Sequence, residues 1–114
     1  MHEYSVVRSI LRQVEQAVGV EARESVREIR VSVGEFSGVN PDLLLMAFDQ
    51  VMAEQGISKR RLVVHPTTLC AECRECGTEF APVSFVFLCP LCGARETRIV
   101  CGEELILESI TLQE

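Results

Sequence analysis

The sequence contains no tryptophan, and aromatic residues of all kinds make up only 5% of its 114 residues. Because hydrophobic residues still account for 47%, any core must be mostly aliphatic. At this length we expect one compact domain, or one domain carrying a small appendage. If the core is divided between two lobes, the smaller lobe needs a staple such as a metal ion.

The sequence also lacks segments that would place it in or across a membrane. No apolar run approaches the roughly 18 residues of a membrane span. The first residues lack the basic start and apolar stretch of a signal peptide. These absences predict a cytoplasmic protein, where clustered cysteines more often hold a metal ion than form disulfides.

Positive charge and histidine are scarce. The chain has 11 lysines and arginines against 17 acidic residues, which gives a formal net charge of -6. A nucleic acid is therefore a poor partner, whereas cations and basic protein surfaces are better ones. With only two histidines, no Ser/His/Asp or paired-carboxylate arrangement indicates an enzyme.

Two segments have the spacing of amphipathic helices. One runs from about residue 4 to residue 18 and ends before Gly19. The other begins after Asn40, which can cap it, has Pro41 in its first turn and ends at Gly56. Their apolar faces consist of Val7, Ile10, Leu11, Val14 and Val18 in the first helix, and of Leu44, Ala47, Phe48, Val51 and Met52 in the second.

Three segments have strand patterns: residues 28–33, residues 62–64 and residues 105–112. His65 and Pro66 are expected to break the second of them. The amino-acid composition changes between residues 67 and 102, where cysteine, glycine and proline accumulate and helical periodicity is lost. The chain therefore predicts an α+β fold, with two helices on one face of a three-stranded sheet and an inserted four-cysteine zinc-knuckle lobe. The expected domains are residues 1–66 plus 103–114, and residues 67–102.

Two C-x₂-C pairs in the insertion have the ligand spacing of a structural zinc site, because Zn²⁺ prefers four ligands in a tetrahedron and soft thiolates suit it. Glycine follows each pair, at Gly77 and Gly93, and tolerates the positive φ that the turn needs after its second ligand. Twelve residues separate the pairs. The predicted zinc ligands are Cys73, Cys76, Cys89 and Cys92.

Cys70 offers a further C-x₂-C pair with Cys73, but Arg74 rather than glycine follows that pair. We therefore expect Cys70 and Cys101 to be small, partly buried residues outside the site. The alternative is a redox pair, if their strands bring them together. For the four predicted ligands, a redox dithiol and disulfides are the competing interpretations. A thioredoxin-type dithiol opens a helix after a strand, and neither C-x₂-C pair is placed in that way.

The N-terminus is a second candidate metal site. The amine of Met1, the ionised backbone amide of His2 and the His2 imidazole can chelate one ion, and the backbone nitrogen of Glu3 is another candidate donor. Nitrogen donors in a near-planar array suit Ni²⁺ or Cu²⁺. On spacing alone, however, a histidine at this position is usually a solvated terminal residue.

The start Met1-His2-Glu3-Tyr4-Ser5, taken with Cys73-Arg-Glu-Cys76-Gly77, Cys89-Pro-Leu-Cys92-Gly93 and Gly102-Glu-Glu-Leu105, resembles the HypA/HybF family. Members are nickel metallochaperones for [NiFe]-hydrogenase maturation. The resemblance covers essentially the whole chain, and the motifs occur in the family's order. It implies transient nickel binding by His2, the Met1 amine and nearby backbone nitrogens such as that of Glu3, in an α/β nickel lobe, and structural zinc on the four cysteines.

The resemblance also implies partners. These are a GTPase accessory protein of the HypB type and the large-subunit precursor of [NiFe]-hydrogenase, with a contribution to urease maturation in some organisms. A homodimer and the role of His65 stay open. The sequence thus predicts a cytoplasmic Ni(II) carrier, not an enzyme.

Two other functions compete with this prediction. A zinc-ribbon module would bind nucleic acid or protein, but the net charge of -6 disfavours nucleic acid. Phe85 and Phe87, which alternate between the cysteine pairs, predict a small hairpin core rather than a base-stacking surface. A zinc hydrolase is the second competitor, yet a zinc ion with four thiolate ligands has no open position for water.

Overall fold

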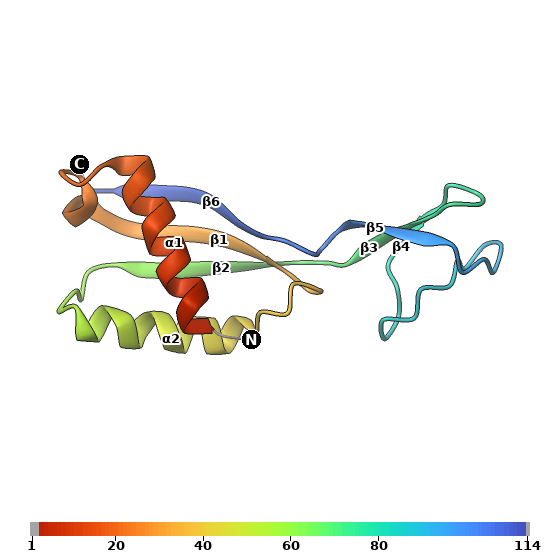
Figure 1. The fold of residues 1–114 in the computed structure, drawn as a ribbon, viewed down its shortest axis with the longest axis horizontal. Helices are drawn as coiled ribbons and strands as arrows, with labels where there is room; N and C mark the ends of the chain where they lie inside the picture. The colour runs from red at the N-terminus through yellow and green to blue at the C-terminus, as the bar shows by residue number, and fades with distance from the viewer. Residues whose placement is uncertain (1–2, 114) are drawn as a thin grey trace.

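The computed structural model describes residues 3–113 and shows two lobes at opposite ends of an elongated molecule (Figure 1). The molecule measures 54 × 24 × 17 Å and has a radius of gyration of 17.6 Å. A compact domain of this length would have a radius of gyration of about 13 Å. The chain is therefore drawn out along one axis instead of folding around a single centre.

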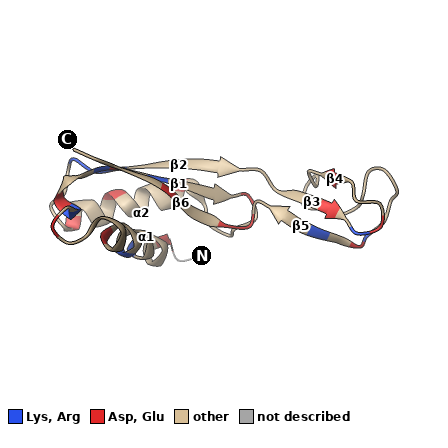
Figure 2. Cartoon of the chain, turned by 90° about the horizontal axis from the view of Figure 1, so that it is seen from above, with Lys and Arg blue, Asp and Glu red and all other residues tan. Residues whose placement is uncertain are grey.

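The first lobe, called the α/β lobe, contains two helices and a three-stranded sheet. Both helices pack on the same face of the sheet (Figures 1 and 2). The central strand β1 pairs in parallel with β2 and antiparallel with β6. The elements are α1 (Glu3–Val18), the 3₁₀ turn η1 (Arg23–Ser25), β1 (Val26–Gly34), α2 (Pro41–Glu54), β2 (Arg61–Thr67) and β6 (Leu105–Leu112).

The core of the α/β lobe lies between the two helices and the sheet, and it is almost entirely aliphatic. Phe48 is the one aromatic side chain in it, as the composition predicts. The expected apolar faces of both helices point into this core; Leu11 and Val18 are half-buried and pack against it. The buried core residues are Val7, Ile10, Val14, Val26, Ile29, Val31, Val33, Leu44, Ala47, Phe48, Val51, Met52 and Leu62.

The start of α2 is fixed by the predicted cap. The side-chain oxygen of Asn40 accepts hydrogen bonds from the N–H groups of Asp42 and Leu43, at 2.9 and 3.1 Å. The backbone N–H of Asn40 in turn donates to the Glu3 carboxylate at 3.4 Å. The first residue of α1 is therefore held beside the first turn of α2.

The expectation that His65 and Pro66 break the second strand is wrong. β2 continues through both residues to Thr67, and in the parallel register His65 lies opposite Ser32 and Pro66 opposite Val33. Proline is tolerated because β2 is at the edge of the sheet. A strand at the edge has one side without a neighbour, where the missing N–H breaks no ladder.

The second lobe, called the cysteine lobe, comprises residues 70–101. It contains a small antiparallel sheet in the order β4-β3-β5. Its strands are β3 (Cys70–Cys73), β4 (Glu79–Phe80) and β5 (Thr97–Cys101). Cys76 lies in the short turn between β3 and β4, and Cys89 and Cys92 lie in the longer segment between β4 and β5 (Figure 1).

A hairpin turn is present between the knuckles, but the prediction that Phe85 and Phe87 form its core is wrong. Ser84 and Phe85 have positive φ values of 52° and 60°, which fold the chain into a tight turn closed by a bridge between Val83 and Val86. Phe85 is 52% exposed. Both phenylalanine rings instead contact Phe36, in the loop after β1, with ring centroids 5.5 and 5.9 Å apart. These rings therefore join the two lobes.

The lobes are connected by a neck, in which the segment between β2 and β3 runs beside the segment between β5 and β6 (Figure 1). Backbone hydrogen bonds from the end of β1 cross it, including Gly34 N–H to Glu104 C=O at 2.9 Å and Phe36 N–H to Gly102 C=O at 2.7 Å. A β-carbon on Gly34 would lie 2.2 Å from the Gly102 oxygen. Glycine is therefore needed where these backbones meet.

Candidate metal centre

Each C-x₂-C pair forms a knuckle, and the two knuckles have the same backbone geometry. In the first, the Gly77 N–H donates to the Cys73 carbonyl at 2.9 Å; in the second, the Gly93 N–H donates to the Cys89 carbonyl at 2.9 Å. The glycines have φ values of +78° and +75°. Residues with side chains rarely adopt this conformation, so the structure confirms the reason for glycine after each pair.

The four cysteine sulfurs converge between the knuckles. All four Sγ atoms lie within 4.8 Å of one another, and Cys73–Cys92 and Cys76–Cys89 are each 3.6 Å apart. Four sulfurs at about 2.3 Å from one zinc ion would lie about 3.8 Å apart. The cluster is therefore consistent with a zinc knuckle.

Hydrogen bonds to the sulfurs of Cys76 and Cys89 favour the thiolate form of these two residues. The Thr78 hydroxyl lies 3.1 Å from the Cys76 sulfur, and hydrogen bonds from the side chain and backbone of Thr78 lower the pKa of Cys76 to about 6. The Cys92 N–H, 3.5 Å from the Cys89 sulfur, lowers the pKa of Cys89. Donors that favour the charged form of a thiol reduce the free energy needed to deprotonate it.

Hydrogen-bond donors alone do not make Cys92 a thiolate. The Ala94 N–H lowers the pKa of Cys92, but the neighbouring thiol of Cys73, burial and the other cysteines outweigh it and raise that pKa to about 12. Four adjacent thiolates repel one another, so the fully deprotonated cluster requires a cation.

Cys70 and Cys101 lie outside this cluster, as the glycine argument predicts. They are nevertheless brought together, because β3 and β5 pair with Cys70 directly opposite Cys101. Among residues 3–113, the four-cysteine cluster is the one group of three or more potential ligands that the structure places within bonding reach of a single ion. His65 is an exposed residue of β2 and does not belong to it.

Comparison with known proteins assigns the chain to a family. A family model described as "Hydrogenase/urease nickel incorporation, metallochaperone, hypA" matches residues 1–112. The chain belongs to the HypA family. Its fold class and its resemblance to these metallochaperones, both expected from the sequence, are thereby confirmed.

Individual HypA proteins are similar to the chain over their whole length. The hydrogenase maturation factor HypA of Aquifex aeolicus is 35% identical over 113 residues, which cover 99% of this chain and 98% of the relative. That of Wolinella succinogenes is 33% identical, with coverages of 99% and 96%. The solution structure of the Ni metallochaperone HypA from Helicobacter pylori superposes with a TM-score of 0.67 at 27% identity, covering 98% of this chain and 97% of that one.

Of the N-terminal residues that the HypA resemblance links to nickel, the structure describes only Glu3. Met1 and His2 lie outside the described residues. Glu3 is the first residue of α1, and the first N–H groups of a helix have no acceptor within the helix. Its carboxylate is engaged with the Asn40 N–H. Within α1 the Glu3 N–H therefore has no acceptor, whereas the Glu3 carboxylate accepts a hydrogen bond from the Asn40 N–H.

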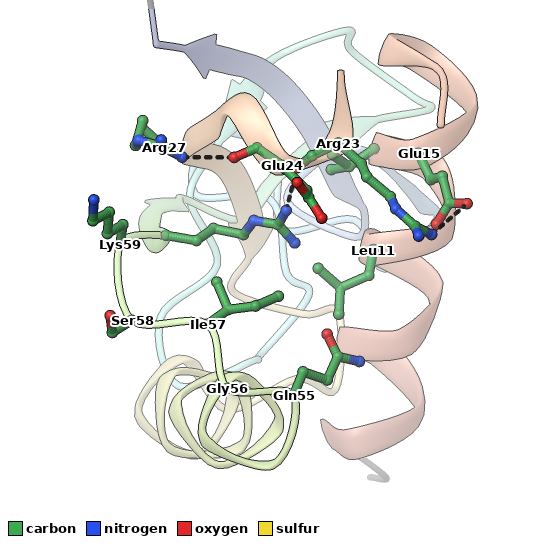
Figure 3. A pocket seen from close by; sticks show the side chains of 12 residues that line it. Leu11, Glu15, Arg23, Glu24, Arg27, Gln55, Gly56, Ile57, Ser58 and Lys59 are labelled. Atoms are coloured by element: carbon green, nitrogen blue, oxygen red, sulfur yellow. Dashed lines mark hydrogen bonds and ion pairs between the residues drawn. The ribbon is translucent and has the colours of Figure 1, made fainter. Parts of the chain in front are cut away.

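A separate cavity of about 670 Å³ lies in the α/β lobe (Figure 3). Its walls come from α1, η1, the start of β1 and the segment between α2 and β2, and contain no cysteine or histidine. Burial lowers the pKa of Arg60 there, and the charges of Arg27 and Arg23 lower it further. The lining carries four basic side chains and two carboxylates, so its charge disfavours a metal cation. No helix in the described part of the chain is both long and apolar enough to cross a membrane.

Proposed function

We propose that this HypA-family chain is a carrier of Ni(II) and not an enzyme. The nickel donors are the Met1 amine, the His2 imidazole and the backbone nitrogen of Glu3. The family match over residues 1–112 carries the proposal. The place of Glu3 in the first turn of α1 supports it, because the first N–H groups of a helix have no acceptor within the helix and because amine, amide and imidazole nitrogens suit Ni²⁺.

A site at the chain terminus suits a carrier because a carrier must release its cargo. Few ligands at the end of a chain can exchange one after another with those of a recipient. Amine and imidazole must lose protons to bind metal, so nickel affinity falls as the pH drops through the range where histidine titrates. The recipient in this proposal is [NiFe]-hydrogenase, and urease is a second candidate recipient.

We further propose that Cys73, Cys76, Cys89 and Cys92 bind a structural Zn(II). The cysteine lobe has almost no core of its own, since Ala71, Cys73 and Cys89 are its only buried residues among residues 70–101. A segment this small and this exposed cannot offset the conformational entropy of folding by apolar burial. A metal ion at the cluster supplies the missing stabilisation.

The proposed partners are a GTPase accessory protein of the HypB type and the hydrogenase large-subunit precursor, in the cytoplasm. Tyr4, Leu43 and Met46 support a protein partner near the N-terminus, because they are 38%, 48% and 66% exposed and line a cavity beside Glu3. A homodimer is a further arrangement that such a surface allows.

The proposed domains are residues 1–66 plus 103–114, and residues 67–102.

The alternative is a zinc-ribbon module that binds nucleic acid or protein. Figure 2 shows that basic and acidic residues are interspersed in the cysteine lobe instead of forming a basic face. The lobe has three arginines and four glutamates, so it would repel a polyanion. Exposed apolar residues such as Val83 and Leu91, 79% and 75% exposed, favour a protein contact over a nucleic-acid contact within this alternative.

The proposal is tested by titrating the zinc-loaded chain with nickel, and by comparing His2→Ala with His65→Ala. His65 is the matched control, because it is the only other histidine. We expect His2→Ala to lose at least about tenfold in nickel affinity, about 1.4 kcal/mol. His65→Ala should bind as the parent does, and zinc should stay at one ion per chain in both variants. Normal nickel binding by His2→Ala would show that the N-terminal assignment is wrong.

A further inference from the structure

Two thiols outside the metal cluster face each other at the base of the cysteine lobe. Cys70 is the first residue of β3, Cys101 is the last residue of β5, and the antiparallel register pairs them directly. Directly opposed residues in antiparallel strands have Cα atoms about 4.5–5.5 Å apart. A disulfide joins Cα atoms that are roughly 4.4–6.8 Å apart. The register, which includes an irregularity between Cys70 and Ala71, therefore places the two residues opposite each other at a backbone spacing that suits a disulfide.

The side chains are also placed to react. The Cys101 sulfur is exposed and lies 3.6 Å from the Thr68 carbonyl, while Cys70 is half-buried. The Cys70 thiol is the largest cause that raises the pKa of Cys101, ahead of burial and the charges of Cys70 and Glu79. An incoming reagent can reach Cys101 because that residue is exposed.

The pair occupies the point where both connecting segments enter the cysteine lobe. Leu69, just before Cys70, is 1% exposed, and a β-carbon on Gly102, just after Cys101, would lie 2.5 Å from the Leu69 Cα. The two connecting segments are thus already in contact beside the thiols. A bond between the thiols would close a loop that contains all four cysteines of the cluster.

We propose that Cys70 and Cys101 form a reversible disulfide that ties β3 to β5 at the base of the cysteine lobe, with a small-molecule disulfide such as oxidised glutathione as the oxidant. One cysteine, as its thiolate, attacks a sulfur of the oxidant; the S–S bond of the oxidant breaks, and the first thiolate leaves. The other cysteine then attacks the protein sulfur of this mixed disulfide and displaces the second thiolate. The two protons from the cysteines end on the two leaving thiolates, so two protein thiols are oxidised and one small disulfide is reduced to two thiols.

The bond has a consequence for the lobe, because the lobe depends on few buried residues. Closing a loop reduces the conformational entropy of the unfolded segment, in the chain-entropy account of disulfide stability. The pairing of β3 with β5 should therefore survive removal of the metal in the oxidised protein and be lost in the reduced protein.

In the first test, the zinc-loaded full chain is treated with oxidised glutathione, and free thiols are then blocked by alkylation. Disulfides are mapped by mass spectrometry, and the zinc content is measured in parallel. We expect a Cys70–Cys101 disulfide with one zinc ion retained. In Cys70→Ser and Cys101→Ser, the remaining cysteine should instead carry one glutathione, because its partner thiol is missing. The proposal is overturned if both thiols of the parent chain stay free, or if each carries its own glutathione.

The second test measures backbone hydrogen exchange after chelation of the metal, in the oxidised and the reduced chain. Ala71 and Ile99 report the pairing, because they lie opposite each other in β3 and β5. We expect exchange at these positions to be at least about tenfold slower in the oxidised chain. Residues of the α/β core such as Ile29 serve as the internal control and should exchange equally in both forms. Equal exchange at Ala71 and Ile99 in both forms would show that the bond does not hold the lobe together.

Discussion

At the scale of single residues, Thr78 decides how easily the first knuckle ionises. Its hydroxyl and its backbone are the two largest causes that lower the pKa of Cys76 to about 6 from its ordinary 9.0. Because this pKa is lowered by folding, the stabilisation that it provides is complete above pH 9.0 and is lost as the pH falls through about 6. Protons compete with metal for the same sulfur, so zinc retention should follow the same direction.

We therefore predict that Thr78→Val raises the pH at which the chain releases zinc. Valine keeps the shape of threonine but removes the hydroxyl donor, so the Cys76 thiolate loses its strongest hydrogen bond. The measurement is zinc released to a chromogenic chelator as the pH is lowered from 8 to 4. Thr111→Val, an exposed position in β6, is the control and should release zinc as the parent does. An unchanged release curve for Thr78→Val would mean that the hydroxyl does not stabilise the bound state.

At the scale of elements, the two segments of the neck depend on glycine for their close approach. Gly102 has a φ of +97°, and a β-carbon there would lie 2.5 Å from the Leu69 Cα and 2.8 Å from the Thr68 oxygen. Both neighbours are backbone atoms, which cannot rotate away as a side chain can. Gly19, at the end of α1, has a similar φ of +86° but nothing within 4 Å of its β-carbon position.

Alanine substitutions at the two glycines therefore distinguish the cost of backbone strain from the cost of steric overlap. We predict that Gly19→Ala costs about 1 kcal/mol of stability, which is the backbone strain alone. Gly102→Ala should cost more than about 3 kcal/mol, because the neck must also open. Urea unfolding followed by circular dichroism measures both. Equal losses of unfolding free energy at the two sites would show that the neck accommodates a β-carbon at residue 102 without cost.

Local sequence patterns predict most of these helices and strands. Both helices and the three strands of the α/β lobe follow from apolar periodicity and the Asn40 cap, because those signals are local. The four-cysteine cluster was predictable for the same reason, since spacing and a following glycine define each knuckle. The continuation of β2 through Pro66 was not, because it depends on β2 being an edge strand.

Contacts between distant segments were the least accessible to sequence reasoning. The pairing of Cys70 with Cys101 depends on a register between β3 and β5 that includes an irregularity after Cys70, and no local signal specifies it. Phe85 and Phe87 alternate as a strand would, yet the positive φ at Phe85 turns their rings toward Phe36. The predicted nickel residues Met1 and His2 lie outside the described residues, so that part of the site stays a prediction.

At the scale of the whole molecule, one loop connects the two proposed metal sites. It carries Phe36, whose ring contacts Phe85 and Phe87 of the cysteine lobe, and it ends at Asn40, whose N–H is bound by the Glu3 carboxylate. A change in the cysteine lobe can therefore reach the first residue of α1 through a short, packed path. Aromatic pairs contribute about 0.5–1.5 kcal/mol beyond their buried area, which limits the coupling to between about twofold and tenfold in affinity.

We predict that Cys73→Ala, which removes a zinc ligand, weakens nickel binding two- to tenfold in the parent chain but not in a Phe36→Ala background. The loss in the parent reflects the connection, and Phe36→Ala removes the connection, so the two changes should not add. Val20→Ala, at a position 62% exposed on the α/β lobe, is the matched control and should leave the effect of Cys73→Ala intact. Nickel titration measures each affinity, and circular dichroism checks that the helices persist. If Cys73→Ala leaves nickel affinity unchanged while the α/β lobe stays folded, the two sites act independently and the zinc serves only to hold its own lobe.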